Sequence, residues 1–302
     1  MTTLKPRFGV NCTTTSGTEW LEAARKAEAL GFDTFIAQDH VGAQLAPLSA
    51  LAAAAMVTTR LRLATLVLDN DFRHPALVAK EAATLDVLSG GRMELGLGAG
   101  WLESDYAQTG IPFEKASVRV ARLEEAVQLC KALLTSRTPV TFRGEHYCLE
   151  ELELLPRPIQ TPRPPIMVGG RLRRTLSFAA READIVSISL LDRRSPELPP
   201  PPSFAQKLEW VRSAGGSRFA SLQLHVNASV VSLTDRPRQA VEPFAARTGM
   251  SVEEALASPG TLVGSVEAIL EKLHAAREQF GVNYWVVHAR SMDDLAGVIA
   301  RL

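Results

Sequence analysis

Short apolar segments alternate with longer amphipathic segments along almost the whole chain, and this alternation limits the fold more than any other feature. Such a pattern is typical of repeated βα units around a parallel sheet. An open, doubly wound sheet can be built from the same alternation, but a count of eight strands favours a (β/α)8 TIM barrel, whose usual size is about 250 residues. The strand-like segments lie at residues 8–11, 32–37, 61–68, 93–98, 165–168, 185–188, 222–231 and 282–287.

Helix-terminus signals mark the amphipathic segments between these strands. Thr18 is expected to cap the first helix, which Gly31 ends, and Pro47 and Pro75 are expected to open the next two. The helices are predicted at residues 18–30, 47–59, 75 onward, 116–134, 173–181, 204–213, 267–280 and 293–302. Residues 1–302 are therefore predicted to form a single barrel domain, with no second domain.

The chain is longer than a minimal barrel, and three irregular stretches account for the surplus. Residues 137–164 and 190–203 are interrupted by prolines, and residues 232–262 resemble an extra helical segment. Loops of this kind on a rigid scaffold commonly carry function. We expect them as insertions at the C-terminal mouth of the barrel, where the substrate would be selected.

The amino-acid composition narrows the kinds of molecule that the protein could bind. The 33 basic and 33 acidic side chains cancel, so no overall field attracts nucleic acid or an anionic membrane, and a small-molecule substrate is expected. No apolar run approaches bilayer length and no secretory leader is visible. Cys12, Cys130 and Cys148 lack the spacing of a disulfide framework, and no histidine triplet has metal-ligand spacing. We therefore expect a soluble, cytoplasmic protein without a metal.

The strongest local signal runs from Arg73-His74-Pro75 to Trp101. Within it, Gly96-Leu-Gly98-Ala99-Gly100 ends the fourth strand, and glycines at a strand exit allow the backbone to approach a planar ligand. The alternative is a dinucleotide-binding Gly-x-Gly-x-x-Gly motif. That interpretation fails, because Trp101 occupies the position of the third glycine and no clean helix start follows.

Polar side chains follow the first two strands. Asp39 and His40 come directly after the second strand, at the end where barrel enzymes expose catalytic groups. A histidine titrates near neutrality, so His40 can accept or supply a proton beside a substrate. Asn11, which ends the first strand, can hydrogen-bond to substrate or ring. The alternatives are a capping aspartate, a surface histidine and a structural asparagine.

Val168-Gly169-Gly170-Arg171 ends the fifth strand just before a predicted helix. Free backbone N–H groups at a helix start attract an anion, and Arg171, Arg173 and Arg174 supply cations beside it. The segment therefore predicts a phosphate site. A glycine turn with solvated arginines is the alternative.

These segments together resemble the bacterial luciferase-like family of flavin-dependent oxidoreductases, and specifically its deazaflavin (coenzyme F-420) branch. The resemblance extends from Phe8 to Asp184, whereas the last hundred residues or so carry little of it. It implies a (β/α)8 barrel that binds coenzyme F-420, or alternatively FMN, at its mouth. Barrels of this family commonly pair, so a homodimer is expected.

The resemblance also implies roles for individual residues. His40 would lie beside the carbon that exchanges hydride, with Asp39 contacting the ring. Thr65, Val67 and Leu68 would belong to a bulge behind the ring, with a non-proline cis peptide at or beside Val67-Leu68. The remaining coenzyme contacts would come from Gly98, Ala99, Gly100, Gly169, Gly170 and Arg171.

One departure from the family affects the reaction. Sugar-phosphate dehydrogenases of the deazaflavin branch carry an acid after the glycine that ends the fourth strand, and Trp101 stands there instead. Either the acid is shifted along the loop, to Glu103 or Asp105, or no acid is used and Trp101 packs on substrate or ring. His74 and His146 are as suited to orienting a helix start or a loop as to touching substrate.

Three functions remain. The first is an F-420-dependent oxidoreductase that transfers a hydride, and the second is an FMN-dependent monooxygenase on the same fold. The third is a barrel without catalysis that serves as a binding subunit. Intact glycines at 98, 100, 169 and 170 argue against the third, since an empty site would not need close backbone approach.

Overall fold

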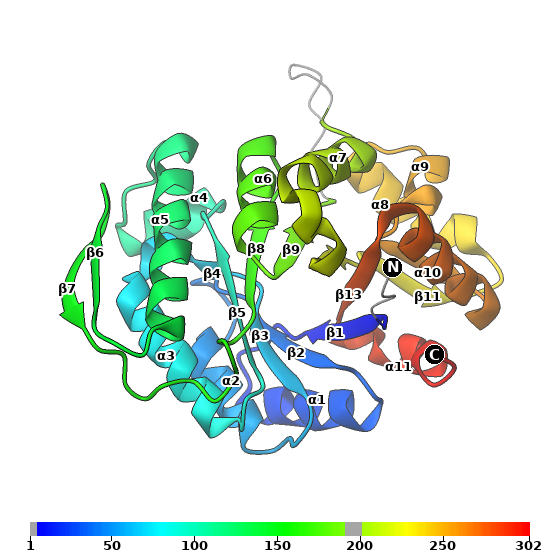
Figure 1. Cartoon of the computed structure of the whole chain (residues 1–302). Helices are drawn as coiled ribbons and strands as arrows, with labels where there is room; N and C mark the ends of the chain where they lie inside the picture. The colour runs from blue at the N-terminus through cyan, green and yellow to red at the C-terminus, as the bar shows by residue number, and fades with distance from the viewer. Residues whose placement is uncertain (1–4, 191–200) are drawn as a thin grey trace.

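A computed structural model describes residues 5–190 and 201–302. Its main sheet closes on itself, because β3 pairs with β5 as well as with β2, and all its strand pairs are parallel (Figure 1). The barrel strands are β1 (Arg7–Asn11), β2 (Thr34–Ala37), β3 (Arg62–Thr65), β4 (Leu68–Asp69), β5 (Met93–Gly98), β8 (Ile166–Gly170), β9 (Ile185–Ile188), β10 (Gln223–Asn227) and β13 (Val282–His288). Since β3 and β4 share one barrel position, the predicted (β/α)8 TIM barrel is confirmed.

Helices surround this barrel. Pro47 and Pro75 stand at the first positions of their helices, as predicted, but the expectation that Thr18 caps the first helix is wrong. Ser16 is the cap, because its extended backbone lets its hydroxyl accept from the Glu19 N–H at 3.3 Å. The helices are α1 (Gly17–Ala29), α2 (Pro47–Ala55), α3 (Pro75–Leu88), α5 (Ala116–Thr135), α6 (Arg173–Glu182), α7 (Phe204–Gly215), α10 (Val266–Phe280) and α11 (Met292–Ile299), with 3-10 turns η1 (Asn70–Phe72), η2 (Gly216–Ser221) and η3 (Ala289–Ser291). Within the described residues, none of the helices has the length and apolar character needed to cross a bilayer.

Side chains alternate between the two faces of each barrel strand. On β1, Phe8 and Val10 belong to the apolar layer between strands and helices. Position 9 faces inward, because a Cβ on Gly9 would lie 2.9 Å from Cδ1 of Ile36. Val286 packs inside the barrel as well. The same alternation points the last residues of β1 and β13 inward at the mouth.

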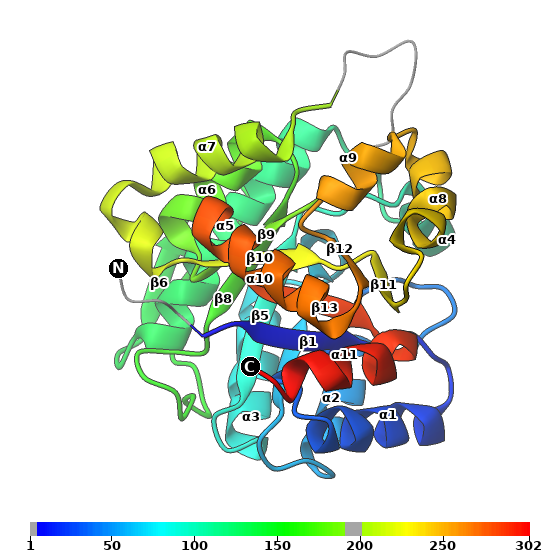
Figure 2. The same ribbon diagram turned by 90° about the vertical axis from the view of Figure 1, so that its right-hand side faces the viewer.

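Two insertions lie at the mouth. Helix α4 (Glu103–Thr109) forms in a stretch predicted to be irregular, and residues 228–264 leave the barrel after β10. In Figure 2, β1 runs from the N-terminus toward the side where α4, α8 and β11 lie. The second insertion has its own small apolar core and confirms the extra helical segment expected at 232–262. It consists of β11 (Val230–Leu233), α8 (Pro237–Thr248), α9 (Val252–Ala257) and β12 (Thr261–Gly264). The predicted loop at 190–203 lies mostly outside the described residues.

The prediction that residues 137–164 form a mouth insertion is wrong in part. They contain an antiparallel hairpin of β6 (Val140–Arg143) and β7 (Cys148–Leu152), which lies beside α5 (Figure 1). Gln160 then donates to the Met93 carbonyl at 2.7 Å and accepts from Arg62 at 2.8 Å, where β5 and β3 begin. A segment that leads from a helix to the next strand must end where that strand begins, which is the end opposite the mouth.

Candidate active site at the barrel mouth

A histidine and a carboxylate meet at the mouth. Nδ1 of His40, just after β2, lies 2.7 Å from Oδ2 of Asp105 on α4. Asp105 is buried, whereas His40 keeps part of its ring exposed. A carboxylate only accepts hydrogen bonds, so Nδ1 carries a proton, and in the neutral imidazole Nε2 keeps its lone pair. The pair therefore presents an oriented base, and the sequence had named Asp105 only as one of two nearby carboxylates.

The carboxylate of Asp39 is hydrogen-bonded to other residues of the chain. It accepts from Nη1 and Nη2 of Arg73 at 2.5 and 3.1 Å, and from the Asp69 N–H at 3.0 Å. These bonds occupy both carboxylate oxygens and tie the exits of β2 and β4 to the start of α3. Asp39 thus fixes the segment that carries His40, and its direct contact with a coenzyme ring stays a prediction.

Trp101 stands beside His40 on an exposed surface. The two rings meet edge to face with centroids 5.7 Å apart, and Trp101 is 71% exposed. Arg119 holds the loop behind it by donating to the Ala99 carbonyl at 3.1 Å and stacking over Phe113. Ala99 is therefore bonded through its backbone, and Trp101 offers a large apolar surface to a planar ligand.

Packing within the chain explains three glycines that the sequence had assigned to ligand approach. A Cβ on Gly96 would lie 2.0 Å from the Thr65 carbonyl oxygen, and one on Gly98 would lie 2.4 Å from Cγ2 of Val67. At Gly100, where φ is +71°, a Cβ would lie 1.9 Å from the Tyr106 hydroxyl. These glycines are required without a ligand, so their presence no longer argues for one.

The bulge predicted behind the ring is present. Of the three residues in it that were predicted to contact the coenzyme, only Val67 is partly exposed. The peptide bond between Leu66 and Val67 is cis, beside the predicted position. Val67 is half-buried and its side chain fills the space next to Gly98 and Gly169. Leu68 is buried in the apolar layer outside the barrel. Thr65 is buried too, and its hydroxyl exchanges hydrogen bonds of 2.8 and 2.9 Å with Gly96. The strand pairing uses the Thr65 side chain and the core uses that of Leu68, and the coenzyme contacts of these two residues stay predictions.

Asn11 and His288 form a second polar pair at the mouth. They are register partners at the ends of β1 and β13. Oδ1 of Asn11 is buried and has no partner among the described residues. Nδ1 of His288 accepts from the Arg290 N–H at 3.3 Å, and burial together with Arg290 lowers the His288 pKa. Neutral His288 thus carries its proton on Nε2 and can donate it to a ligand. The sequence analysis missed His288, although its place directly after the last strand is the same signal that identified His40.

The predicted phosphate cradle has the expected helix start. Helix α6 begins at Arg173 after Leu172, which provides no side-chain cap, so its first N–H groups lack a side-chain acceptor. Gly170 is in a tight position, since a Cβ would lie 3.0 Å from Cγ2 of Thr175. Arg174 instead forms an ion pair of 2.7 Å with Glu124. The arrangement fits an anion at the exit of β8, and the assignments of Gly169, Gly170 and Arg171 to it stay predictions.

His74 and His146 also lie in the segments that resemble the family, and both have structural roles. His74 is the N-cap of α3, where Nδ1 accepts from the Ala76 N–H at 3.2 Å, and its ring meets Tyr147 edge to face. The His146 backbone N–H donates to Glu125 at 2.9 Å. His74 therefore orients a helix start, and His146 belongs to the loop that β6 and β7 enclose.

Beneath the mouth, Asp69 lies in a buried acidic cluster. Its Oδ1 is 2.9 Å from the Tyr106 hydroxyl, which is also 3.2 Å from Asp71. Burial, aided by the charges of Asp71 and Asp39, raises the pKa of Asp69 to about 6. The cluster couples the end of β4 to α4, and so helps to place the helix that carries Asp105.

The family model described as luciferase-like monooxygenase matches residues 3–242. An uncharacterised protein of Mycobacterium tuberculosis is 40% identical over 130 residues, which are 43% of each chain. An F-420-dependent glucose-6-phosphate dehydrogenase of Intrasporangium calvum is 35% identical over 176 residues, covering 55% of this chain and 52% of the relative. An FMNH(2)-dependent dimethylsulfone monooxygenase of Pseudomonas putida is 32% identical over 127 residues, covering 42% and 34%. The chain spans about half or less of the length of these curated relatives.

Solved structures share the whole architecture. The coenzyme F-420 dependent tetrahydromethanopterin reductase from Methanopyrus kandleri has a TM-score of 0.79 at 17% identity, covering 99% of both chains. A monooxygenase from Streptomyces bottropensis has a TM-score of 0.75 at 23% identity, covering 98% of this chain and 99% of the other. At these identities the similarity establishes the fold.

Proposed function

The chain belongs to the luciferase-like monooxygenase family, and we propose that it is a coenzyme F-420-dependent oxidoreductase that transfers a hydride between the deazaflavin and a small organic substrate. The observation that carries the proposal is the bond between His40 and buried Asp105 at the barrel mouth. An oriented imidazole with a free Nε2 suits proton transfer coupled to hydride transfer. The relatives named as F-420-dependent dehydrogenases add support.

In the oxidation direction, Nε2 of His40 accepts the proton of a substrate hydroxyl while the hydride leaves the carbon that bears it. Asp105 stabilises the imidazolium that results. In the reduction direction His40 returns the proton to the oxygen. The bound coenzyme supplies the two-electron acceptor or donor, and the protein supplies position and electrostatics.

Other residues bind and orient. Val67 forms an apolar wall at the exits of β5 and β8, and Trp101 offers a face to a ring or substrate. The first turn of α6 suits a phosphate group. Asn11 and His288 provide an unpaired acceptor and a neutral donor for polar substrate atoms. This chemistry fits a planar coenzyme that carries a phosphate.

The second candidate is an FMN-dependent monooxygenase. Its support is the similarity to the FMNH(2)-dependent dimethylsulfone monooxygenases, one of which matches over 69% of this chain at 27% identity. The third candidate is a barrel without catalysis, and the counter-argument from the glycines weakens, because packing explains Gly98 and Gly100. The His40–Asp105 pair now argues against it, because an inert barrel would not need a base oriented at its mouth.

Titration of the purified protein with F-420 and with FMN, followed by the fluorescence of each ring, tests the proposal. We expect saturable binding of F-420 at micromolar concentration and much weaker binding of FMN. Binding of FMN alone would overturn the proposal in favour of the monooxygenase. Binding of neither coenzyme would favour a non-catalytic subunit.

We also propose that the protein forms a homodimer through α2 and α3. Leu77 and Leu88 of α3 are 61% and 51% exposed, and their separation of eleven residues is about three helical turns, so they share a face. Met56, at the end of α2, is exposed on the helix packed beside it. Light scattering after gel filtration should give a dimer for the native chain and a monomer for Leu77→Arg; a native monomer would contradict it.

A further inference from the structure

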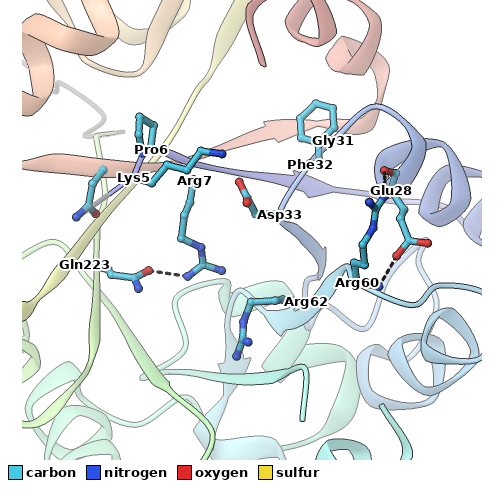
Figure 3. A pocket seen from close by; sticks show the side chains of 11 residues that line it. Lys5, Pro6, Arg7, Glu28, Gly31, Phe32, Asp33, Arg60, Arg62 and Gln223 are labelled. Carbon is cyan, nitrogen blue, oxygen red and sulfur yellow. Dashed lines mark hydrogen bonds between the residues drawn. The ribbon is translucent and has the colours of Figure 1, made fainter. Parts of the chain in front are cut away.

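A cavity of about 580 Å³ opens at the amino-terminal ends of the barrel strands, opposite the proposed active site (Figure 3). Its volume is in the range of small-molecule sites, about 300–1,000 Å³. The residues before and at the starts of β1, β2, β3, β10 and β13 line it, among them Lys5, Arg7, Arg60, Arg62 and Asn283. Neither the hydride transfer nor the coenzyme uses this end of the barrel.

The carboxylates of the lining are largely engaged by the backbone. Four cationic side chains face only two acidic ones, Glu28 and Asp33. Oε1 of Glu28 accepts from three consecutive N–H groups, those of residues 59 to 61. Oδ2 of Asp33 accepts from the Phe8 N–H at 2.8 Å, and Arg7 and Lys5 oppose the charge of Asp33. The cavity therefore has an excess of positive charge.

Bonds to their oxygens orient the two amide side chains of the lining, and their NH2 groups have no acceptor among residues 5–190 and 201–302. Oε1 of Gln223 accepts from Nη1 of Arg7 at 2.6 Å, and Oδ1 of Asn283 accepts from the Leu224 N–H at 3.0 Å. Each amide oxygen accepts one bond, which orients the side chain and leaves its NH2 group as the donor. The amide N–H groups remain to bind a ligand.

The cations divide into two pairs. Arg7 and Arg62 both bond to Glu94 in the barrel floor, so their charges are shared with that carboxylate. Lys5 and Arg60 form no ion pair with any described residue, and the only side-chain bond of Arg60 is a 3.5 Å contact with the Glu28 carbonyl. In Figure 3, Asp33 lies between Lys5 and Arg60. Among the described residues, Lys5 and Arg60 are thus attracted to Asp33 and Glu28 at longer range but bonded to neither carboxylate, and the groups left to bind a ligand are mainly donors.

We propose that this cavity binds a small metabolite through an oxyanion, a phosphate or carboxylate group held by Arg60 and Lys5 with help from the amides of Gln223 and Asn283. Charge-assisted bonds to guanidinium and ammonium groups are the strong ones, and the planar guanidinium suits both anions. Such a ligand would bind the folded barrel and not the unfolded chain. It would therefore stabilise the protein by an amount that grows with the logarithm of its concentration above the Kd, from a site remote from the reaction.

Calorimetric titration of the coenzyme-free protein with inorganic phosphate and with citrate tests the site, and the stronger of the two probes identifies the group preferred. We expect millimolar or tighter binding of at least one, weakened about tenfold in Arg60→Gln and in Lys5→Gln. Lys5 is exposed and its substitution spares the fold. Arg238→Gln is the matched control, since Arg238 is an exposed arginine paired with Glu253 in the mouth insertion.

Two outcomes would overturn the inference. One is the absence of binding by either anion at millimolar concentration. The other is binding that survives in Arg60→Gln and Lys5→Gln but is lost in Arg173→Gln, which would place the anion at the start of α6. Because coenzyme is absent from the experiment, failure here leaves the proposed function untouched, and failure of the coenzyme titration leaves this site untouched.

Discussion

Nδ1 of His40 lies 2.7 Å from Oδ2 of Asp105, and 65 residues of sequence separate the two. The bond joins the exit of β2 to helix α4 of the loop that follows β5. It gives this chain a carboxylate beside its histidine although Trp101 occupies the position where an acid was expected. A carboxylate therefore lies further along the loop, as the first of the two alternatives requires, and its use in the reaction stays a prediction.

Asp105→Asn should lower kcat about 10²-fold while changing the affinity for coenzyme less than about twofold, because the amide no longer stabilises the charged imidazole. Steady-state kinetics and coenzyme titration measure the two effects. Asp105→Glu should recover part of kcat. The matched control is Glu103→Gln, an exposed acid on the same helix, which should behave as the native enzyme. Equal losses of kcat and affinity in Asp105→Asn would mean that the residue only shapes the mouth.

Trp101→Ala should weaken binding of coenzyme or substrate about three- to tenfold, the range of one aromatic contact. The free energy of unfolding should change by less than about 0.5 kcal/mol, since the side chain is largely exposed. Trp101→Phe should retain most of the affinity. Urea unfolding beside ligand titration separates the two quantities, and unaltered affinity for both ligands would remove Trp101 from the site.

Gly98→Ala should destabilise the protein by about 1–3 kcal/mol, because its Cβ would lie 2.4 Å from Cγ2 of Val67. In a Val67→Ala background the same change should cost less than about 1 kcal/mol, since the clash is gone. Gly17→Ala, with no atom near its Cβ, serves as the control. Urea unfolding of the four-member cycle measures the coupling. Additive losses would show that Val67 is not what requires a glycine at position 98.

His225→Gln should make the protein less sensitive to acid. His225 is fully buried and 2.8 Å from the Ser187 hydroxyl, and burial, with Arg7, lowers its pKa to about 3. Below pH 6.5 the unfolded chain binds a proton that the folded chain refuses, so stability present above that pH falls by about 1.4 kcal/mol per unit as the pH drops toward 3.

Between pH 7.5 and pH 5, native protein should therefore lose about 2 kcal/mol more than His225→Gln, as measured by urea unfolding. His274→Gln, which alters an exposed histidine, should follow the native protein. Parallel pH profiles for native protein and His225→Gln would show that His225 is charged or hydrated in the fold.

The glycines show where packing within the chain supplies a reason that the sequence did not reveal. Gly96, Gly98 and Gly100 were read as openings for a ligand, whereas the carbonyl of Thr65, the side chain of Val67 and the hydroxyl of Tyr106 occupy the space beside them. All three neighbours come from other elements. A sequence pattern reports that a position needs a glycine, but it does not report which atom requires it.

The sequence alone determined the barrel, its strand ends and the candidate base, because the alternation of buried and exposed side chains is a local property that each segment carries. It could not determine that Asp105 bonds to His40 or that His288 stands beside Asn11, since those contacts depend on the register and closure of the barrel. The same holds for the cavity at the opposite end, where Lys5, Arg60 and Asn283 meet. Closing eight strands into a ring brings residues from the two ends of the chain within bonding distance, and only the tertiary structure decides which ones.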